Sequence, residues 1–248
     1  MDSTRKTALL TGVFFIITFI TSIPALGLYG PVLNDADYVL GSGSDGRVTA
    51  GALLEVGLAV AGIGSAVTIF PILRRHNEGA ALAYVAARVV ESTVIIVGIV
   101  SVLAVVTLRK DFAGATGADA ATFVTAGKAL VAVHKWTFLL GPGFCAGIEN
   151  GLLLGFLMYR TALVPRPIAV LGLVGGTLAV LSGIAELFGI FPQVSAAAFV
   201  LVLPEAVFEA AFGIWLTVKG FKPAPILSGF AGPRTVGEAV ATPDPTVA

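Results

Sequence analysis

Hydrophobic residues occur along this chain in six long runs, and the segments between the runs carry most of the charge. Each run meets the requirement of about 20 apolar residues for a helix that crosses a bilayer. The runs are continuous and lack the alternation of a membrane β-strand, so helices are favoured over a barrel. The pattern therefore predicts an all-α membrane bundle of six transmembrane helices, at about residues 8–29, 51–73, 80–108, 139–159, 167–190 and 195–218.

The first run requires a separate decision, because an N-terminal apolar segment can also be a secretory signal. Arg5 and Lys6 precede it, and no charged residue interrupts it from Ala8 to Tyr29. A signal has a shorter apolar core and a small-residue cleavage site. We therefore expect this run to be retained as the first transmembrane helix.

Composition agrees with a membrane protein and argues against several other classes. Of the 248 residues, 56% are hydrophobic and only 12% are charged, whereas soluble domains are about 25% charged. Fifteen basic residues balance fifteen acidic ones, and no basic stripe indicates a nucleic-acid partner. A single cysteine, Cys145, excludes an internal disulfide and a multi-cysteine metal site. No zinc, nucleophile or phosphate-binding motif is found, so we expect no metal and no cofactor.

The distribution of basic residues predicts the orientation. The segments on the side of the N-terminus hold eight lysines and arginines, and the opposite segments hold four. Because basic loops remain in the cytoplasm, both termini are expected there, in a multi-pass protein of the plasma membrane. Residues 1–222 form the predicted membrane domain, and the proline-rich residues 223–248 are expected to be a disordered cytoplasmic tail.

The segment before the fourth predicted span has features of a helix at the membrane surface. Lys128 and Lys135 are seven residues apart and hence on one helix face, and Trp136 suits an interface. Gly141-Pro142-Gly143 follows, and this combination is typical of a helix break. We therefore expect an interfacial helix that ends before the fourth span begins.

Several motifs resemble those of one known family. They lie in the third span, before and after the fourth span, and in the sixth span: Arg88-Val89-Val90-Glu91, His134–Phe144, Leu153–Arg160 with Leu163–Arg166, and Pro204-Glu205 with Glu209, Gly213, Trp215-Leu216 and Lys219-Gly220-Phe221. The chain resembles domain of unknown function family 4386, an uncharacterised group of bacterial membrane proteins, over about residues 5–222. The resemblance implies about six helices in a bacterial plasma membrane and no particular activity. Lys135 stands where the family has an acidic residue after the histidine, which weakens a metal-binding or proton-relay role for His134.

Six glutamates lie inside the predicted helices, together with Arg88 as the only basic residue well inside one. Ionisable groups at membrane depth are costly, and they usually face a bundle interior or a wet cavity. From their positions along the helices we divide them into two sets. The candidate buried polar cluster is Arg88, Glu91, Glu149, Glu205 and Glu209, and the candidate outer mouth is Glu55 and Glu186.

Residue spacing brings several of these groups together. Arg88 and Glu91 are three residues apart, and Glu205 and Glu209 are four apart, so each pair shares a helix face. Two close carboxylates do not both ionise easily in a low dielectric, so either Arg88 pairs with one or one retains a proton. Pro204 precedes Glu205 and removes a backbone donor, which favours a kink beside the acids.

Glycine recurs every four residues in the fourth span, at positions 143, 147, 151 and 155. Such a stripe allows close helix packing, and Glu149 lies on nearly the opposite face of the helix. Gly172 and Gly176 offer a similar face in the fifth span. These faces predict tight packing within the bundle, and they also suit contacts in a homo-oligomer.

Three functional hypotheses remain open, and no motif identifies a substrate. The excess of buried carboxylates over Arg88 favours a protein that binds or moves a small solute or protons through the bilayer. A non-catalytic sensor or accessory subunit is the first alternative. An intramembrane enzyme that uses paired glutamates is the second, and it is the least supported. The same residues also fit a structural interhelical ion pair.

Overall fold

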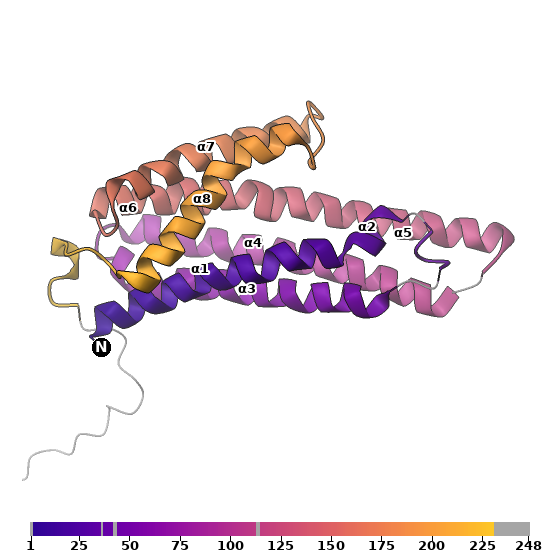
Figure 1. The fold of residues 1–248 in the computed structure, drawn as a ribbon, viewed down its shortest axis with the longest axis horizontal. Coiled ribbons are helices and arrows are strands. Elements are labelled where there is room, and N and C mark those ends of the chain that lie inside the picture. Colours follow the sequence, from indigo (N-terminus) through magenta and orange to yellow (C-terminus); the bar gives the residue numbers. More distant parts are fainter. Residues whose placement is uncertain (1, 36, 42–43, 113–114, 231–248) are drawn as a thin grey trace, which may run out of the picture.

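The computed structural model describes residues 2–35, 37–41, 44–112 and 115–230, and these residues form helices without any strand (Figure 1). Six of the helices are long and apolar enough to cross a membrane. The predicted class is therefore confirmed as an all-α, multi-pass membrane bundle. The six helices are α1 (Ser3–Leu28), α3 (Asp45–Leu73), α4 (Glu78–Phe112), a continuous helix from Gly117 to Thr161, α7 (Arg166–Leu187) and α8 (Ala196–Val218).

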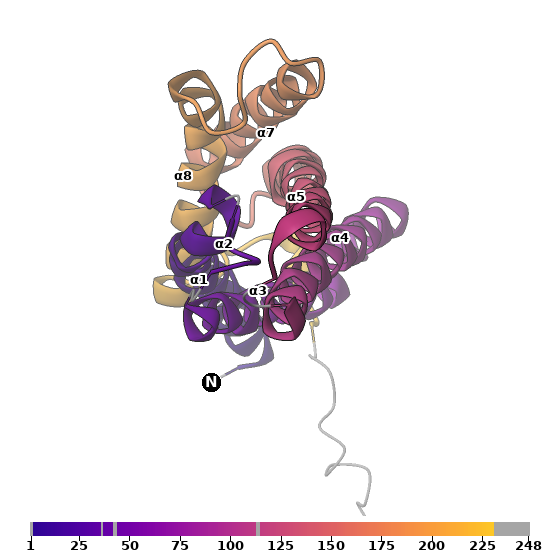
Figure 2. The same cartoon turned by 90° about the vertical axis from the view of Figure 1, so that its right-hand side faces the viewer.

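The two ends of the bundle differ in shape. We call the end that holds the N-terminus the proximal end and the opposite end the distal end. The α7–α8 hairpin diverges from the other helices and stops short of the distal end (Figures 1 and 2). The 35 residues of α4 span roughly 50 Å at 1.5 Å per residue, whereas the apolar layer of a bilayer is about 30 Å thick. Part of α4 therefore extends beyond that layer, and we expect this part at the distal end, where α7 and α8 stop short and where the short helix α2 (Gly30–Asn34) lies.

The predicted break at Gly141-Pro142-Gly143 is wrong. The chain passes from α5 (Gly117–Phe138) through two π-helical segments, η1 (Leu139–Cys145) and η2 (Gly147–Leu154), into α6 (Gly155–Thr161). Proline disrupts the hydrogen bonds of an α-helix, but the wider turns of a π-helix accommodate Pro142 without a break. As a result, α5 and α6 lie along one line in Figure 1, and α5 continues the fourth span instead of lying across its end.

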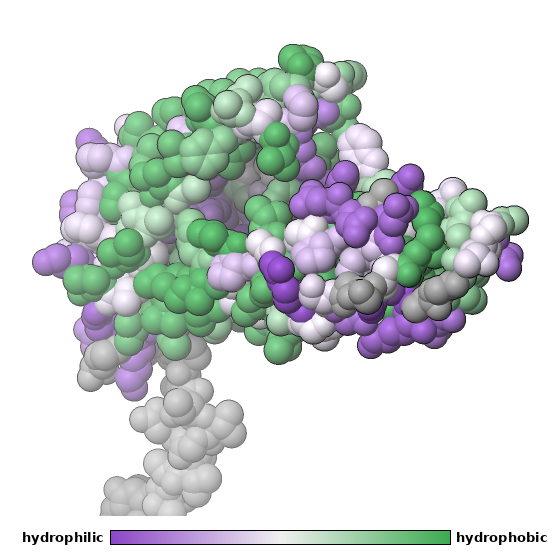
Figure 3. Space-filling view, turned by 45° about the vertical axis from the view of Figure 1, so that its right-hand side comes forward, coloured by the Kyte–Doolittle hydropathy of each residue, from purple (hydrophilic) through white to green (hydrophobic). Residues whose placement is uncertain are grey.

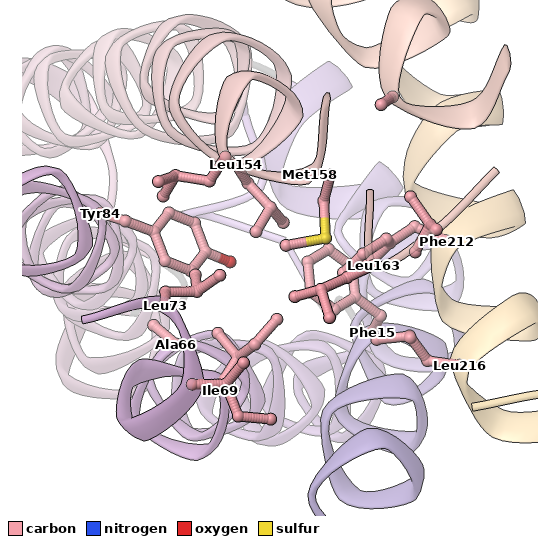
Figure 4. Close-up of a cluster of buried hydrophobic side chains, with 14 of the residues drawn as sticks. Phe15, Ala66, Ile69, Leu73, Tyr84, Leu154, Met158, Leu163, Phe212 and Leu216 are labelled. Atoms are coloured by element: carbon pink, nitrogen blue, oxygen red, sulfur yellow. The ribbon is translucent and has the colours of Figure 1, made fainter. Parts of the chain in front are cut away.

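A close-packed apolar cluster fills the proximal half of the bundle. Figure 4 shows Phe15 of α1, Leu73 of α3, Tyr84 of α4, Met158 of α6 and Phe212 of α8 pointing toward one another, and all five are nearly inaccessible to solvent. Lipid tails are as apolar as these side chains, so the cluster stabilises the bundle through packing contacts between helices. We call it the proximal cluster.

Three glycines of the fourth span, at positions 147, 151 and 155, pack against α7. The sequence predicted close packing of this face but not the partner helix. A Cβ atom added to Gly176 would lie 2.6 Å from the Cα atom of Gly151, and one added to Gly155 would lie 3.2 Å from the amide nitrogen of Leu173. Such distances require glycine at the crossing of two backbones. α7 of the same chain covers this glycine face. Contact between two copies of the protein through glycine-rich faces stays a prediction.

The packed part of the chain reaches beyond the predicted domain boundary at residue 222. Arg5 donates hydrogen bonds from Nη1 to the Leu216 carbonyl (2.7 Å) and from Nη2 to the Thr217 carbonyl (2.6 Å), which caps the end of α8. The 3₁₀ turn η3 (Pro225–Leu227) and Phe230 then pack beside the proximal cluster. Residues of the predicted tail up to Phe230 are thus packed, and the rest of that prediction, residues 231–248, lies outside the described residues.

Candidate functional site

Arg88 of α4 lies at the centre of a buried network. Its Nη1 atom is 2.7 Å from Glu91 Oε2 and 2.7 Å from Glu149 Oε1, so one guanidinium nitrogen contacts two carboxylates. Its Nε atom donates to the Gly62 carbonyl at 3.3 Å, and its guanidinium lies over the Phe15 ring. The Arg88 side chain is only 4% exposed, so these contacts replace its hydration. The sequence left open whether Arg88 pairs with an acid or an acid retains a proton, and in the structure Arg88 contacts two acids.

The π-helical segment places Glu149 and the glycine face on different sides of the fourth span. Glu149 is fully buried and faces α4 through its ion pair with Arg88, whereas Gly151 faces α7. This agrees with the predicted separation of the acid from the glycine stripe. Within the described residues, the second oxygen of Glu149 has no hydrogen-bond partner. The network therefore retains a free acceptor at its centre.

Glu209 of α8 belongs to a neighbouring chain of hydrogen bonds through Asn150, the residue after Glu149. The Tyr84 hydroxyl donates to Asn150 Oδ1 at 3.2 Å, and Asn150 Nδ2 donates to Glu209 Oε1. These bonds connect α4, the fourth span and α8 just above the proximal cluster. Tyr84 was not predicted as part of the site, because its position in an apolar run gives no signal of a partner on another helix.

Glu205 lies one helical turn from Glu209 and has a different environment. It is 3% exposed, and neither of its carboxyl oxygens has a hydrogen-bond partner within the described part of the chain. A Cβ atom added to Gly151 would lie 2.6 Å from Glu205 Oε2, and one added to Gly175 would lie 2.6 Å from the Glu205 amide nitrogen. Gly151 therefore provides the space that this carboxyl group occupies, and Gly175 allows the close approach of the Glu205 backbone. Buried polar groups are usually hydrogen-bonded, so an unpartnered carboxyl group is unusual.

A cavity of about 100 Å³ lies beside the network. We call it the central cavity, and Arg88, Glu91 and Glu209 line it together with Thr18 and Ser22 of α1. The volume corresponds to about three water molecules at roughly 30 Å³ each. Figure 3 shows a hollow in the surface between the α7–α8 hairpin and the helices beneath it, with hydrophilic atoms at its floor. The site therefore combines buried charge with space for a small ligand.

The two predicted outer-mouth residues occupy different environments. Glu55 is only 8% exposed and accepts a hydrogen bond from the Tyr29 hydroxyl at 2.8 Å. Glu186 is half-buried near the end of α7 and accepts a hydrogen bond from Ser182. Within the described residues, no hydrogen bond or ion pair joins these two glutamates.

Glu55 belongs to a second buried polar group that sequence reasoning missed. His134 is 4% exposed, and its ring packs edge-on against Tyr29 at 5.2 Å between centroids. Glu55 and His134 line one small cavity with Pro142, which also lines the central cavity. His134 turns inward, whereas its neighbours Lys135 and Trp136 are exposed, as the polar face predicted for this segment requires.

Comparison with known proteins identifies the family. A family profile described as "Domain of unknown function (DUF4386)" matches residues 10–220, which is most of the chain. The chain belongs to the DUF4386 family. No curated protein and no solved structure matches it. The resemblance drawn from the sequence motifs is confirmed.

The central network gives this DUF4386 protein more buried acids than buried bases. Glu91 and Glu149 contact the guanidinium of Arg88 directly, Glu209 lines the central cavity with it, and Glu205 is buried one turn from Glu209. Within the described residues, no three His, Cys, Asp or Glu side chains converge closely enough to hold a metal ion. The arrangement is suited to bind a proton or a small positively charged or hydrogen-bonding solute.

Proposed function

We propose that this membrane protein is a carrier that binds a small solute in the central cavity and moves it together with protons. The observation that carries the proposal is the buried carboxyl group of Glu205, which has no hydrogen-bond partner among the described residues and lies one turn from Glu209, a residue that lines that cavity. We assign Glu205 and Glu209 as the groups that carry protons, and Arg88 as the fixed charge that holds Glu91 and Glu149.

The free energy of burial supports this assignment. An ionised acid at the centre of a membrane helix costs about 2.5–3.5 kcal/mol on insertion scales. Arg88 offsets this cost for Glu91 and Glu149 through direct contact, and Asn150 donates to Glu209. Glu205 has no such contact in the described structure, so it must carry a proton or face a cation. Exchange between these two states is the elementary step of a proton-linked carrier.

The shape of the bundle supports access from one side. The proximal cluster closes the bundle beneath the Tyr84–Asn150 bond, whereas the diverging α7–α8 hairpin leaves a hollow on the distal side (Figures 3 and 4). With both termini in the cytoplasm of a bacterium, as the basic residues predict, this hollow faces the outside. Release to the cytoplasm would then require the proximal cluster to open, which is the rocking motion of alternating access.

The proposal predicts that removing the two proton-carrying groups lowers proton movement. We expect Glu205→Gln and Glu209→Gln each to reduce proton flux into liposomes by about tenfold or more, because an amide has the shape of the acid but cannot exchange a proton. Flux would be driven by a potassium diffusion potential and read with an internal pH dye. Small cations such as ammonium would be added as candidate solutes.

Glu186→Gln is the matched control. It removes the same charge as the other two substitutions, but Glu186 lies at the end of α7 and does not line the central cavity. It should retain wild-type flux. Folded Glu205→Gln and Glu209→Gln variants with unchanged flux would remove these residues from the mechanism. Wild-type flux equal to that of empty liposomes, with every candidate solute, would contradict the carrier and favour the sensor or accessory subunit.

A further inference from the structure

A second cavity, separate from the central one, lies in the distal part of the bundle. Its volume is about 270 Å³, and it lies between the segment that contains α2, the distal half of α4 and α5. We call it the distal cavity. At roughly 30 Å³ per water molecule, it has space for about nine waters or a ligand with a similar number of heavy atoms. Its position on the extended part of α4 and α5 places it at or beyond the surface of the apolar layer.

The walls of the distal cavity are apolar at the floor and charged at the rim. Val32, Val39 and Val105 line it and are at most 2% exposed. Lys128 and Lys135 line the α5 side and are exposed. Seven residues separate these lysines, so they lie on one face of α5, roughly 10 Å apart at 1.5 Å per residue. Within the described residues, neither lysine pairs with a carboxylate.

Side-chain contacts hold the loop that forms the opposite wall. The Tyr38 hydroxyl donates to Asp45 at 2.8 Å, and Arg109 pairs with Asp45, donates to the Gly41 carbonyl at 2.9 Å and packs over the Tyr38 ring. Burial, and then the hydrogen bond to Asp45, raise the pKa of Tyr38 well above its usual range, so this wall of the cavity presents a neutral phenol. The cavity is therefore preformed, with a fixed apolar floor.

We propose that the distal cavity binds a small amphipathic anion, with its apolar chain on the valine floor and its carboxylate or phosphate group between Lys128 and Lys135. The unpaired lysines provide the complementary charge, and a carboxylate or phosphate accepts their hydrogen bonds. Asp35 is the one acid on the rim, and it already accepts a hydrogen bond from the Asp37 amide at 2.9 Å. The same chemistry occurs in a free short-chain acid and in an anionic lipid headgroup.

Binding of hexanoate to the protein in nanodiscs of neutral lipid tests the proposal, with empty nanodiscs to subtract partitioning. Hexanoate should bind more tightly than hexanol or hexylammonium, which share its chain but not its charge. Lys128→Gln and Lys135→Gln should each weaken hexanoate binding about fivefold, the effect of an exposed ion pair. Asp35→Asn should strengthen it, because it removes a like charge from the rim.

Lys110→Gln is the matched control, because Lys110 is exposed at the same end of the bundle but does not line the distal cavity. It should leave hexanoate binding unchanged. Ala132→Leu adds apolar volume at the wall of the cavity without changing its charge and should weaken binding of hexanoate and hexanol alike. Competition by anionic lipid in the nanodisc would assign the anion to a headgroup, and its absence would assign it to a free solute. Equal binding of hexanoate and hexanol, or equal effects of Lys128→Gln and Lys110→Gln, would overturn the proposal.

Discussion

Replacing Arg88 with glutamine is expected to lower the free energy of unfolding by about 3–5 kcal/mol, the largest effect of any single charge change in this protein. The substitution leaves Glu91 and Glu149 buried against each other without the guanidinium that contacts both. The loss exceeds that of a surface ion pair because water does not replace the missing partner at this depth. Thermal and denaturant unfolding of the purified protein in detergent would measure it.

Arg75→Gln provides the matched control for Arg88→Gln. Arg75 is exposed at the proximal end and donates one hydrogen bond, to the Ser228 carbonyl, so its replacement should change stability by at most about 0.5 kcal/mol. Adding Glu91→Gln and Glu149→Gln to Arg88→Gln removes the uncompensated acids and should recover most of the loss. An Arg88→Gln protein as stable as the Arg75→Gln protein would show that Arg88 does not hold the network together.

A structural role accounts for the ion pairs of Arg88 but not for the unpartnered carboxyl group of Glu205 in the described structure. A structural role explains why Arg88, Glu91 and Glu149 contact one another, since each buried charge has a partner. It does not explain Glu205, whose carboxyl group adds a cost of burial without a compensating contact in the described structure. Stability alone would favour glutamine or leucine at this position, and the acid is therefore the strongest indication of function in the central network.

The sequence predicts the number of helices, the close-packed glycine face and the shared helix face of Arg88 and Glu91. Each of these depends on residue patterns within a single helix. Six apolar runs specify six helices, and a four-residue glycine repeat specifies a close-packed face. The separation of Glu149 from that face also follows from helical geometry. In the structure Glu149 contacts α4, whereas Gly151 packs against α7.

Contacts between helices and the course of the fourth span could not be predicted in this way. The Tyr29–Glu55 and Tyr84–Asn150 hydrogen bonds join residues that are 26 and 66 positions apart, and no local pattern marks such partners. Proline between two glycines normally indicates a break, yet Pro142 lies within the π-helix η1. Neighbouring helices on several sides hold this segment helical and override the local preference of its residues.

Gly151→Ala is expected to destabilise the bundle by about 1–3 kcal/mol or more, although the change adds one methyl group. The added Cβ atom would lie 2.6 Å from Glu205 Oε2 and 2.7 Å from the Gly176 amide nitrogen. The Gly176 backbone cannot move aside as a flexible side chain can, so α7 must separate from the fourth span. The displaced Glu205 carboxyl group should also lower proton flux beyond the loss of folded protein. Unfolding in detergent and flux per folded molecule in liposomes measure the two effects separately.

Gly27→Ala is the matched control, because Gly27 lies in α1 and a Cβ atom there would meet no other atom within 4 Å. Alanine in an open helical position stabilises a protein by roughly 0.5–1 kcal/mol relative to glycine, so the two substitutions should have opposite signs. If Gly151→Ala also proved neutral or stabilising, α7 would not pack on the fourth span as closely as described. The space that holds Glu205 would then not depend on glycine, and the link between this packing and proton movement would be lost.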